Sequence, residues 1–260
     1  MKVSIEETKK CKQFQILFQL MCSLCEEVNI YFKDDKMFIQ GIDTGHICLF
    51  ELHITKEWFK SYEVDEDQEM FGVNLKILSK VLSCWKEGQT ITIDNPKEDK
   101  LMFHFESKDL YKGFEMGLFD YDTEILSIPD VEYDVDVTLN SKMFSSLISE
   151  LDSFGDVVEI HSTNDYINFK TKQNTFQTQV ENRLDVSDLE GYSIIEEGNV
   201  QVDMSLQYMM NVVQFSRIAK DVDINMSKSY PMKFTYNLTD NDYVSIWVSP
   251  RMEEEEEEDY

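Results

Sequence analysis

Residues 135–161, VDVTLNSKMFSSLISELDSFGDVVEIH, contain the pattern that decides the fold. The first part alternates apolar and polar residues, with the apolar ones at Val135, Val137 and Leu139. Asn140 or Ser141 can cap a helix, and the spacing of one apolar helical stripe follows at Phe144, Leu147, Ile148 and Leu151. Gly155 ends this helix, and a second alternating stretch covers residues 157–161. The segment therefore predicts a strand, a helix and a second strand.

The same strand, helix and strand pattern occurs four times along the chain. The second copy covers residues 71–93, with Asn74 as a helix cap and Gly88 as a stop. The first copy covers residues 3–32 and the fourth covers residues 200–226. Two copies fall in each half, and each is followed by further strand-like segments. The sequence therefore predicts an α+β fold of two similar domains, in which sheets form the bulk and helices cover one side.

The length of the chain, 260 residues, also suits two domains. We expect the first domain over residues 1–118 and the second over residues 135–252. Residues 119–134 combine acidic residues, a proline and isolated apolar residues, which predicts an extended connector on the surface. Residues 253–260 are almost entirely acidic, which predicts a solvated tail.

The composition restricts the class of protein. No apolar run approaches eighteen residues, and the first twelve residues lack an apolar signal core, so we expect neither a membrane protein nor a secreted one. Five cysteines are an odd number, which favours a reducing intracellular compartment over a disulfide framework. The formal net charge of −27, from 51 acidic and 24 basic residues, at first argues against a nucleic-acid partner.

The distribution of the basic residues changes that interpretation. The expected helices, at 9–22, 75–86, 141–152 and 205–220, contain nine basic residues but only two acids, Glu150 and Asp152. A positive face made of helices on an acidic protein predicts contact with DNA phosphates without reading of sequence. We assign DNA binding to Lys9, Lys10, Lys12, Lys76, Lys80, Lys142, Arg217 and Lys220. The alternative is that these lysines are ordinary residues of helix surfaces.

Five short segments resemble those of one protein family: QGIDTGHI at 40–47, GVNL at 72–75, LSIP at 126–129, PMKFTY at 231–236 and VSPR at 248–251. They are similar to a loop, the entry of the second helix, the interdomain connector and the C-terminal strands of the proliferating cell nuclear antigen family of DNA sliding clamps. The resemblance extends along essentially the whole chain. It implies a polymerase processivity factor and repair scaffold, in which three subunits form a ring with helices lining the hole and sheets outside.

The resemblance also implies the partners. They would be double-stranded DNA, a DNA polymerase, a clamp loader and other proteins that carry a short peptide motif. Subunits would join through Leu110–Leu118 of one copy and Thr175–Arg183 of the next. The expected location is the nucleus, with a viral replication site in the cytoplasm as the alternative.

Partners of this family insert a glutamine, an aliphatic residue and paired aromatic residues into a pocket beneath the connector. An apolar cavity with polar edges suits such a plug. The corresponding residues here are Ile42, His46, Ile47, Leu49, Leu126, Ile128, Pro129, Pro231, Trp247 and Ser249. Trp247 replaces the tyrosine that is usual in the family; the alternative interpretation makes it an ordinary core residue.

The chain departs from the family in its positive charge. Residues 65–67 are acidic where many relatives are basic, and Ser146 and Ser149 stand where relatives carry arginines. The expected lining of the ring is therefore less positive than usual. This leaves open a heteromeric ring, or a monomer that holds DNA by one basic face, besides the homotrimer.

The sequence offers few candidates for catalytic or metal chemistry. Cys22 and Cys25 form a single Cys-x-x-Cys pair, for which buried thiols are a simpler interpretation than a zinc site. The pairs Asp120 with Asp122 and Asp240 with Asp242 suggest a metal-dependent nuclease, but their turn positions favour solvated surface acids. We therefore predict no catalytic residue, no metal and no cofactor.

Overall fold

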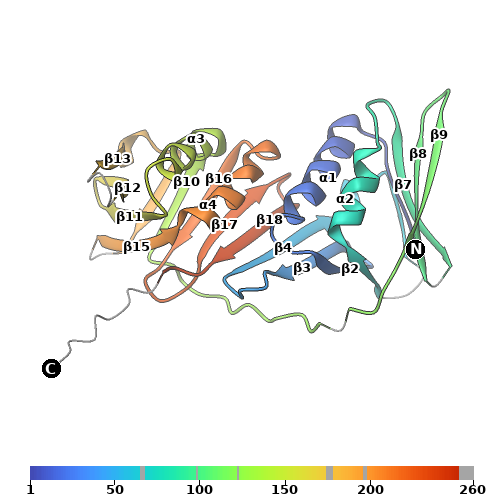
Figure 1. Cartoon of the computed structure of the whole chain (residues 1–260), viewed down its shortest axis with the longest axis horizontal. Helices are drawn as coiled ribbons and strands as arrows, with labels where there is room; N and C mark the ends of the chain where they lie inside the picture. Colours follow the sequence, from blue (N-terminus) through green and yellow to red (C-terminus); the bar gives the residue numbers. More distant parts are fainter. Residues whose placement is uncertain (65–67, 98, 122, 174–177, 196–197, 252–260) are drawn as a thin grey trace. The chain divides into compact units, whose positions relative to one another are not determined.

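The computed structural model describes residues 1–64, 68–97, 99–121, 123–173, 178–195 and 198–251. These residues form two compact units (Figure 1). Unit 1 contains Met1–Pro129, Arg217–Ala219 and Thr235–Ile246, and unit 2 contains Asp130–Ser216, Lys220–Phe234 and Trp247 onward. The division passes through β17 (Met232–Asn237) and β18 (Tyr243–Val248). Within the described residues, no helix has the length and apolar character needed to span a membrane.

Unit 1 contains two sets of antiparallel strands. The first has the order β5 (Ser61–Glu63), β1 (Lys2–Ile5), β7 (Thr90–Lys97), β8 (Lys100–Glu106) and β9 (Tyr111–Gly117). The second runs from β18 through β4 (Cys48–Thr55), β3 (Lys36–Ile42) and β2 (Glu27–Lys33) to β6 (Gln68–Asn74). The short 3-10 helix η1 (Lys56–Trp58) follows β4.

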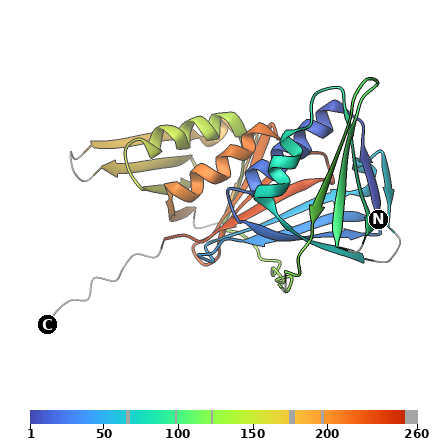
Figure 2. The ribbon, with the colours of Figure 1, turned by 45° about the vertical axis from the view of Figure 1, so that its right-hand side comes forward.

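Two adjacent helices, α1 (Thr8–Met21) and α2 (Leu75–Ser83), cover both sets of strands (Figure 2). Phe14 and Phe18 of α1 pack with their ring centroids 4.8 Å apart. Together with Leu78 of α2 they border a small internal space whose other walls include Phe32 of β2 and Phe103 of β8. One apolar core therefore joins the helices to both sheets. Truncating a buried phenylalanine of this core to alanine costs about 3–5 kcal/mol of stability.

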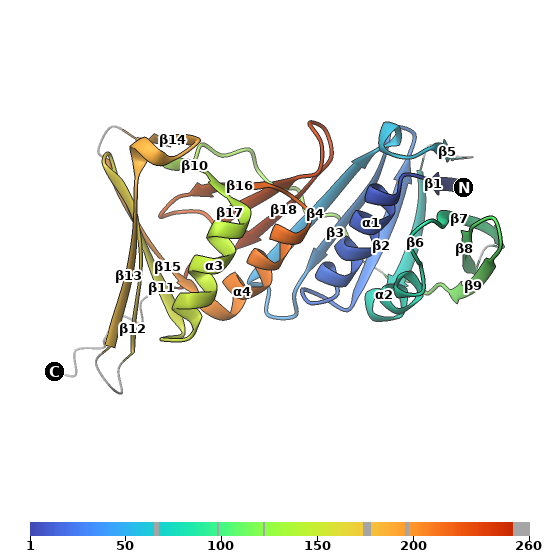
Figure 3. The ribbon, with the colours of Figure 1, turned by 90° about the horizontal axis from the view of Figure 1, so that it is seen from above.

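Unit 2 repeats this arrangement. One set of strands has the order β14 (Gly191–Ile194), β10 (Val135–Asn140), β16 (Asp221–Met226) and β17. The other has the order β13 (Thr178–Asp185), β12 (Tyr166–Gln173), β11 (Val157–Thr163) and β15 (Asn199–Ser205). The covering helices are α3 (Ser141–Asp152) and α4 (Leu206–Val213), which lie side by side (Figure 3). The 3-10 helices are η2 (Val186–Asp188) and η3 (Gln214–Arg217).

Phe144 of α3 explains how this second core is joined. Its ring centroid lies 6.0 Å from that of Phe169 in β12 and 6.2 Å from that of Phe234 in β17. All three side chains are fully buried. The helical stripe seen in the sequence therefore contacts one strand from each set.

The predicted repeat is confirmed, because each of the four α-helices of the described chain lies between two strands in sequence. The side chains of Asn74 and Asn140 accept hydrogen bonds from the backbone N–H of Ile77 and Met143, both at 3.1 Å, which confirms both caps. The prediction that the second helix reaches residue 86 was wrong, because α2 ends at Ser83 and Trp85 turns inward to donate its indole N–H to the carbonyl of Gln89.

The fourth helix also ends earlier than the expected residue 220. The α-helix ends at Val213 and continues as the tighter helix η3 to Arg217. The buried residues here are Val212, Val213, Phe215 and Ile218. Val212, Phe215 and Ile218 are three residues apart, the spacing at which side chains of a 3-10 helix align. Phe215 is the buried residue of this 3-10 helix.

Candidate nucleic-acid interface and partner site

The basic side chains of unit 1 lie along its two helices. Lys9 and Lys12 on α1 and Lys76 and Lys80 on α2 are exposed. Lys10 is half-buried, because its ammonium donates a hydrogen bond of 2.7 Å to the carbonyl of Trp58 and lies 5.4 Å from the centre of that indole ring. These two helices therefore present five lysines and no acidic residue.

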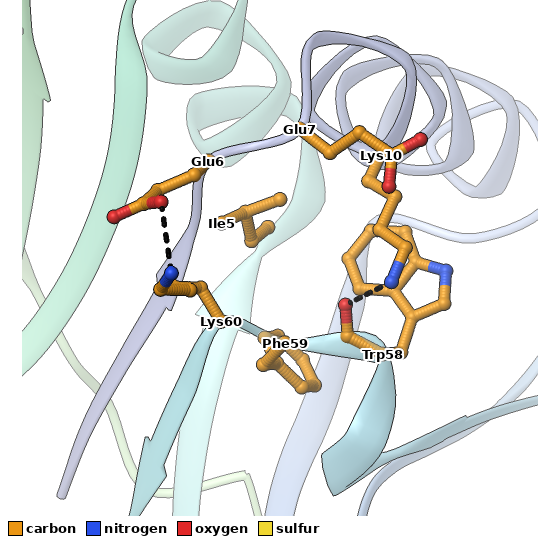
Figure 4. A pocket seen from close by; sticks show the side chains of 7 residues that line it. All are labelled: Ile5, Glu6, Glu7, Lys10, Trp58, Phe59 and Lys60. Carbon is orange, nitrogen blue, oxygen red and sulfur yellow. Dashed lines mark hydrogen bonds and ion pairs between the residues drawn. The ribbon is translucent and has the colours of Figure 1, made fainter.

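Lys10 also borders a cavity of about 400 Å³ at the start of α1 (Figure 4). The other residues that line the cavity are Lys60, Ile5, Glu6, Glu7, Trp58 and Phe59. Lys60 forms an ion pair of 3.4 Å with Glu6. The charges that line the cavity are therefore of both signs, so it adds no positive site to the lysines of the helices.

The helices of unit 2 carry much less positive charge. Lys142 of α3 is exposed, but the same helix ends in the exposed acids Glu150 and Asp152. Helix α4 has no charged residue. Arg217, the last residue of η3, is exposed and belongs to unit 1. The positive charge of the helical faces is therefore concentrated on α1 and α2.

The two serines that are expected to stand where relatives carry arginines lie on the exposed side of α3. Ser146 and Ser149 are both exposed, and the hydroxyl of Ser149 donates to the carbonyl of Ser145 at 2.7 Å. The acidic residues 65–67 lie outside the described residues.

Lys220 is exposed but surrounded by acids. Its ammonium lies 3.2 Å from a carboxylate oxygen of Asp221 and 3.4 Å from one of Glu190. The hydrogen bond and charge of Asp221, followed by Glu190, raise the pKa of Lys220. Its charge is therefore partly compensated within the protein, unlike that of the exposed lysines on α2.

One part of the predicted partner site is a tight loop after β3. The carboxylate of Asp43 accepts hydrogen bonds from the backbone N–H of Gly45 at 3.1 Å, Ile47 at 2.8 Å and Cys48 at 2.7 Å. His46 has a φ of 54°, a left-handed conformation that residues other than glycine rarely adopt outside tight turns. The loop leaves His46 and Ile47 exposed, with Ile42 and Leu49 half-buried beside it.

The connector contributes three further residues of unit 1. Leu126 is 48% exposed, Pro129 is exposed and Ile128 is half-buried. The backbone of Leu126 is held by the side chain of Gln40. Sequence reasoning did not assign Gln40 to a site, and only the strand register could have indicated it.

The remaining predicted partner residues belong to unit 2. Pro231 is exposed, and its carbonyl accepts a hydrogen bond of 3.3 Å from the hydroxyl of Tyr133. Trp247 is half-buried, with the ammonium of Lys233 5.5 Å from its ring centre, so it is not an ordinary core residue. Burial raises the pKa of Tyr133, and a hydrogen bond with Trp247 opposes that rise. Ser249 is half-buried.

The two segments expected at subunit contacts correspond to sheet edges. Strand β9 is outermost in the first sheet of unit 1, and β13 is outermost in its sheet of unit 2. Leu110 and Tyr111 at the start of β9 are 51% and 59% exposed. Residues 175–177 of the second segment lie outside the described residues.

The acidic residues that suggested a metal site are not grouped as metal ligands in the described part of the chain. Within the described residues, no group of three or more His, Cys, Asp or Glu side chains is placed to hold a metal ion. The prediction that Asp242 is a solvated surface acid was wrong: it is 3% exposed and accepts hydrogen bonds of 2.7 Å from both the N–H and the hydroxyl of Thr55. Asp240 is exposed, and Asp122 lies outside the described residues.

Comparison with protein-family models gives two matches. Residues 7–125 match the N-terminal domain of proliferating cell nuclear antigen, and residues 127–251 match its C-terminal domain. Together the two matches cover nearly the whole chain, and the four helices and many strands of the structure agree with that fold. The chain therefore belongs to the proliferating cell nuclear antigen family, the family of DNA sliding clamps.

Proposed function

We propose that this clamp encircles duplex DNA, holds a DNA polymerase at its template and recruits replication and repair proteins through a hydrophobic pocket under the connector. The observation that carries the proposal is the charge of α1 and α2, which present five lysines and no acid on a chain of net charge −27. Such a face attracts phosphates while the acidic remainder repels DNA from other surfaces. Tethering raises the effective concentration of the polymerase at its template without new chemistry.

The DNA contacts in this proposal are made by Lys9, Lys12, Lys76, Lys80, Lys142 and Arg217, which are exposed. Lys10 and Lys220 contribute less, because each has a partner within the protein. Lysine is a flexible point charge that binds phosphate without reading bases. The contact is therefore independent of sequence and strongly dependent on salt. No catalysis, metal or cofactor is needed for this role.

The ring in this proposal is a homotrimer closed by β9 of one copy and β13 of the next. Both strands are edges, and an edge strand presents unpaired N–H and C=O groups that another strand can satisfy. A head-to-tail contact of this kind closes into a ring when the rotation per subunit is one third of a turn. A heteromeric ring and a one-face monomer are the alternatives.

The domains of the clamp would be residues 1–118 and 135–252, joined by the connector at 119–134 and followed by an acidic tail at 253–260. The partner-binding residues would be those of the loop after β3 and of the connector in unit 1, and Pro231, Trp247 and Ser249 in unit 2. The proposed location is the nucleus, or a viral replication site in the cytoplasm.

Light scattering coupled to size exclusion tests the ring. From dilute to concentrated protein, the proposal predicts a mass near three times 30.6 kDa. A variant that introduces proline at Glu115 removes a backbone donor from the open edge of β9, because the N–H of Phe114 and of every second residue faces β8 instead. The Glu115→Pro protein should shift to monomers. A wild-type chain that stays monomeric at every concentration contradicts the homotrimer.

A further inference from the structure

Four residues form a row across the second sheet of unit 1. Strand pairing places Gly72 of β6 opposite Asn29 of β2, Asn29 opposite Gln40 of β3, and Gln40 opposite Glu51 of β4. Directly opposite residues of neighbouring strands point to the same face of a sheet. The row therefore joins positions that lie far apart in sequence.

The connector, drawn in green in Figure 1, contacts three residues of this row, Gly72, Asn29 and Gln40. A Cβ atom added to Gly72 would lie 2.1 Å from the carbonyl oxygen of Phe119, so this close approach requires glycine. The side-chain amide of Asn29 donates to the carbonyl of Tyr121 at 2.7 Å and to the hydroxyl of Thr123 at 3.2 Å. Residues further along the connector thus contact strands further along the sheet.

Gln40 makes the third contact and uses both ends of its amide. Its Nε2 donates to the carbonyl of Leu126 at 2.9 Å, and its Oε1 accepts from the N–H of Leu126 at 2.7 Å. The second hydrogen of Nε2 is donated to Glu51 at 2.9 Å. Because a carboxylate can only accept, Glu51 fixes which end of the Gln40 amide faces it. That orientation is the one that pairs with both backbone groups of Leu126.

Glu51 is itself held in place. Its other carboxylate oxygen lies 3.1 Å from Nε2 of His53, and both side chains are largely buried. The imidazole of His53 stacks on the ring of Tyr243 at 4.7 Å and 19°, and the edge of Phe38 packs against it at 4.9 Å. The aromatic rings thus hold the imidazole of His53 in place, and His53 holds the carboxylate of Glu51. Glu51 in turn orients the amide of Gln40.

We propose that the row of Gly72, Asn29, Gln40 and Glu51 positions the connector, and that Gln40 with Glu51 determines how tightly a partner peptide binds beside Leu126. This inference rests on the proposed partner-binding function. Leu126 is half exposed and residues 123–127 lie at the surface, so few apolar contacts hold this part of the chain. A partner that binds against an undocked connector must first order it, and that cost lowers affinity. Gln40 and Glu51 are positioning residues in this account.

The test replaces Gln40 by methionine, which keeps the length of the side chain but removes both hydrogen bonds to Leu126. Two quantities are measured: hydrogen exchange of the Leu126 N–H by NMR, and affinity for a fluorescent peptide that carries a glutamine, an aliphatic residue and two adjacent aromatic residues. We expect exchange to quicken about tenfold and affinity to fall about tenfold, as two lost hydrogen bonds imply. Glu51→Gln should give a smaller change of both, because its amide can present a donor to Gln40.

Gln201→Met is the matched control, since Gln201 is an exposed glutamine of β15 in unit 2. It should change neither quantity, and the urea midpoint of Gln40→Met should stay close to that of the wild type. Unchanged exchange and unchanged affinity in Gln40→Met would overturn the proposal. If the wild type fails to bind the peptide while exchange at Leu126 still quickens in Gln40→Met, the proposed pocket is wrong and the positioning row stands.

Discussion

Replacing Lys76 and Lys80 of α2 by glutamine should weaken DNA binding and flatten its dependence on salt. Each lysine that contacts a phosphate contributes about 0.9 to the slope of log affinity against log salt. Extrapolated from 1 M salt, one contact corresponds to about fivefold in affinity at 0.15 M salt. Losing two phosphate contacts should therefore lower affinity about thirtyfold and reduce the slope by about 2, and a homotrimer, which carries the substitutions in every subunit, should show at least these changes. Fluorescence anisotropy of a labelled duplex at several salt concentrations measures both.

Lys142→Gln on α3 provides the comparison. That helix also carries Glu150 and Asp152, so its face already has a net negative charge and the slope should change by less than 1. Neither variant alters the core, because all three lysines are exposed. An unchanged salt slope in the double variant, or a larger change of slope in Lys142→Gln, would refute the assignment of the main phosphate contacts to α1 and α2.

Three other predictions follow from single features of the structure. Ser146→Arg with Ser149→Arg should strengthen duplex binding several-fold and steepen the salt slope, because both positions are exposed on a weakly charged helix; the same anisotropy titration measures this. Asp242→Ala should lower the free energy of unfolding by about 2–4 kcal/mol in a urea titration, since two donors of Thr55 lose their acceptor, whereas exposed Asp240→Ala should change it little. Burial raises the pKa of Cys48 to about 12, so folding favours its neutral form and the free energy of unfolding should fall as pH rises above about 9. Burial also raises the pKa of Cys11 and of Cys25, so the fall should persist in Cys48→Ala but be shallower than in the wild type by about 1.4 kcal/mol per pH unit in urea titrations.

The fold was largely predictable because its signals are local. Apolar spacing located all four helices, and Asn74 and Asn140 were identifiable as caps from their position before an apolar stripe. The end of the fourth helix was not predictable in this way, since Phe215 is buried in η3 and continues the apolar spacing past the end of the α-helix. Helix periodicity gives no information on where an α-helix changes to a 3-10 turn.

The candidate sites were predictable only in part. The lysines of α1 and α2 could be assigned to one face because they share short helices. Gln40 and Glu51 could not be linked to Leu126, because a one-residue change of register would place them on the opposite face. Asp242 was misread for a similar reason: the partner that buries it, Thr55, lies at the end of a distant strand.

Topological linkage to DNA is the property that distinguishes a ring around the duplex from a protein bound to its surface. The protein would be mixed with a nicked circular plasmid, its subunits would be joined by an amine crosslinker, and the complex would be washed in 1 M salt, at which phosphate contacts are largely screened. A closed ring should stay on the circular DNA after crosslinking and should leave when a restriction enzyme linearises the DNA. Protein that washes off the circle, or that stays on the linear DNA, would contradict a ring around DNA.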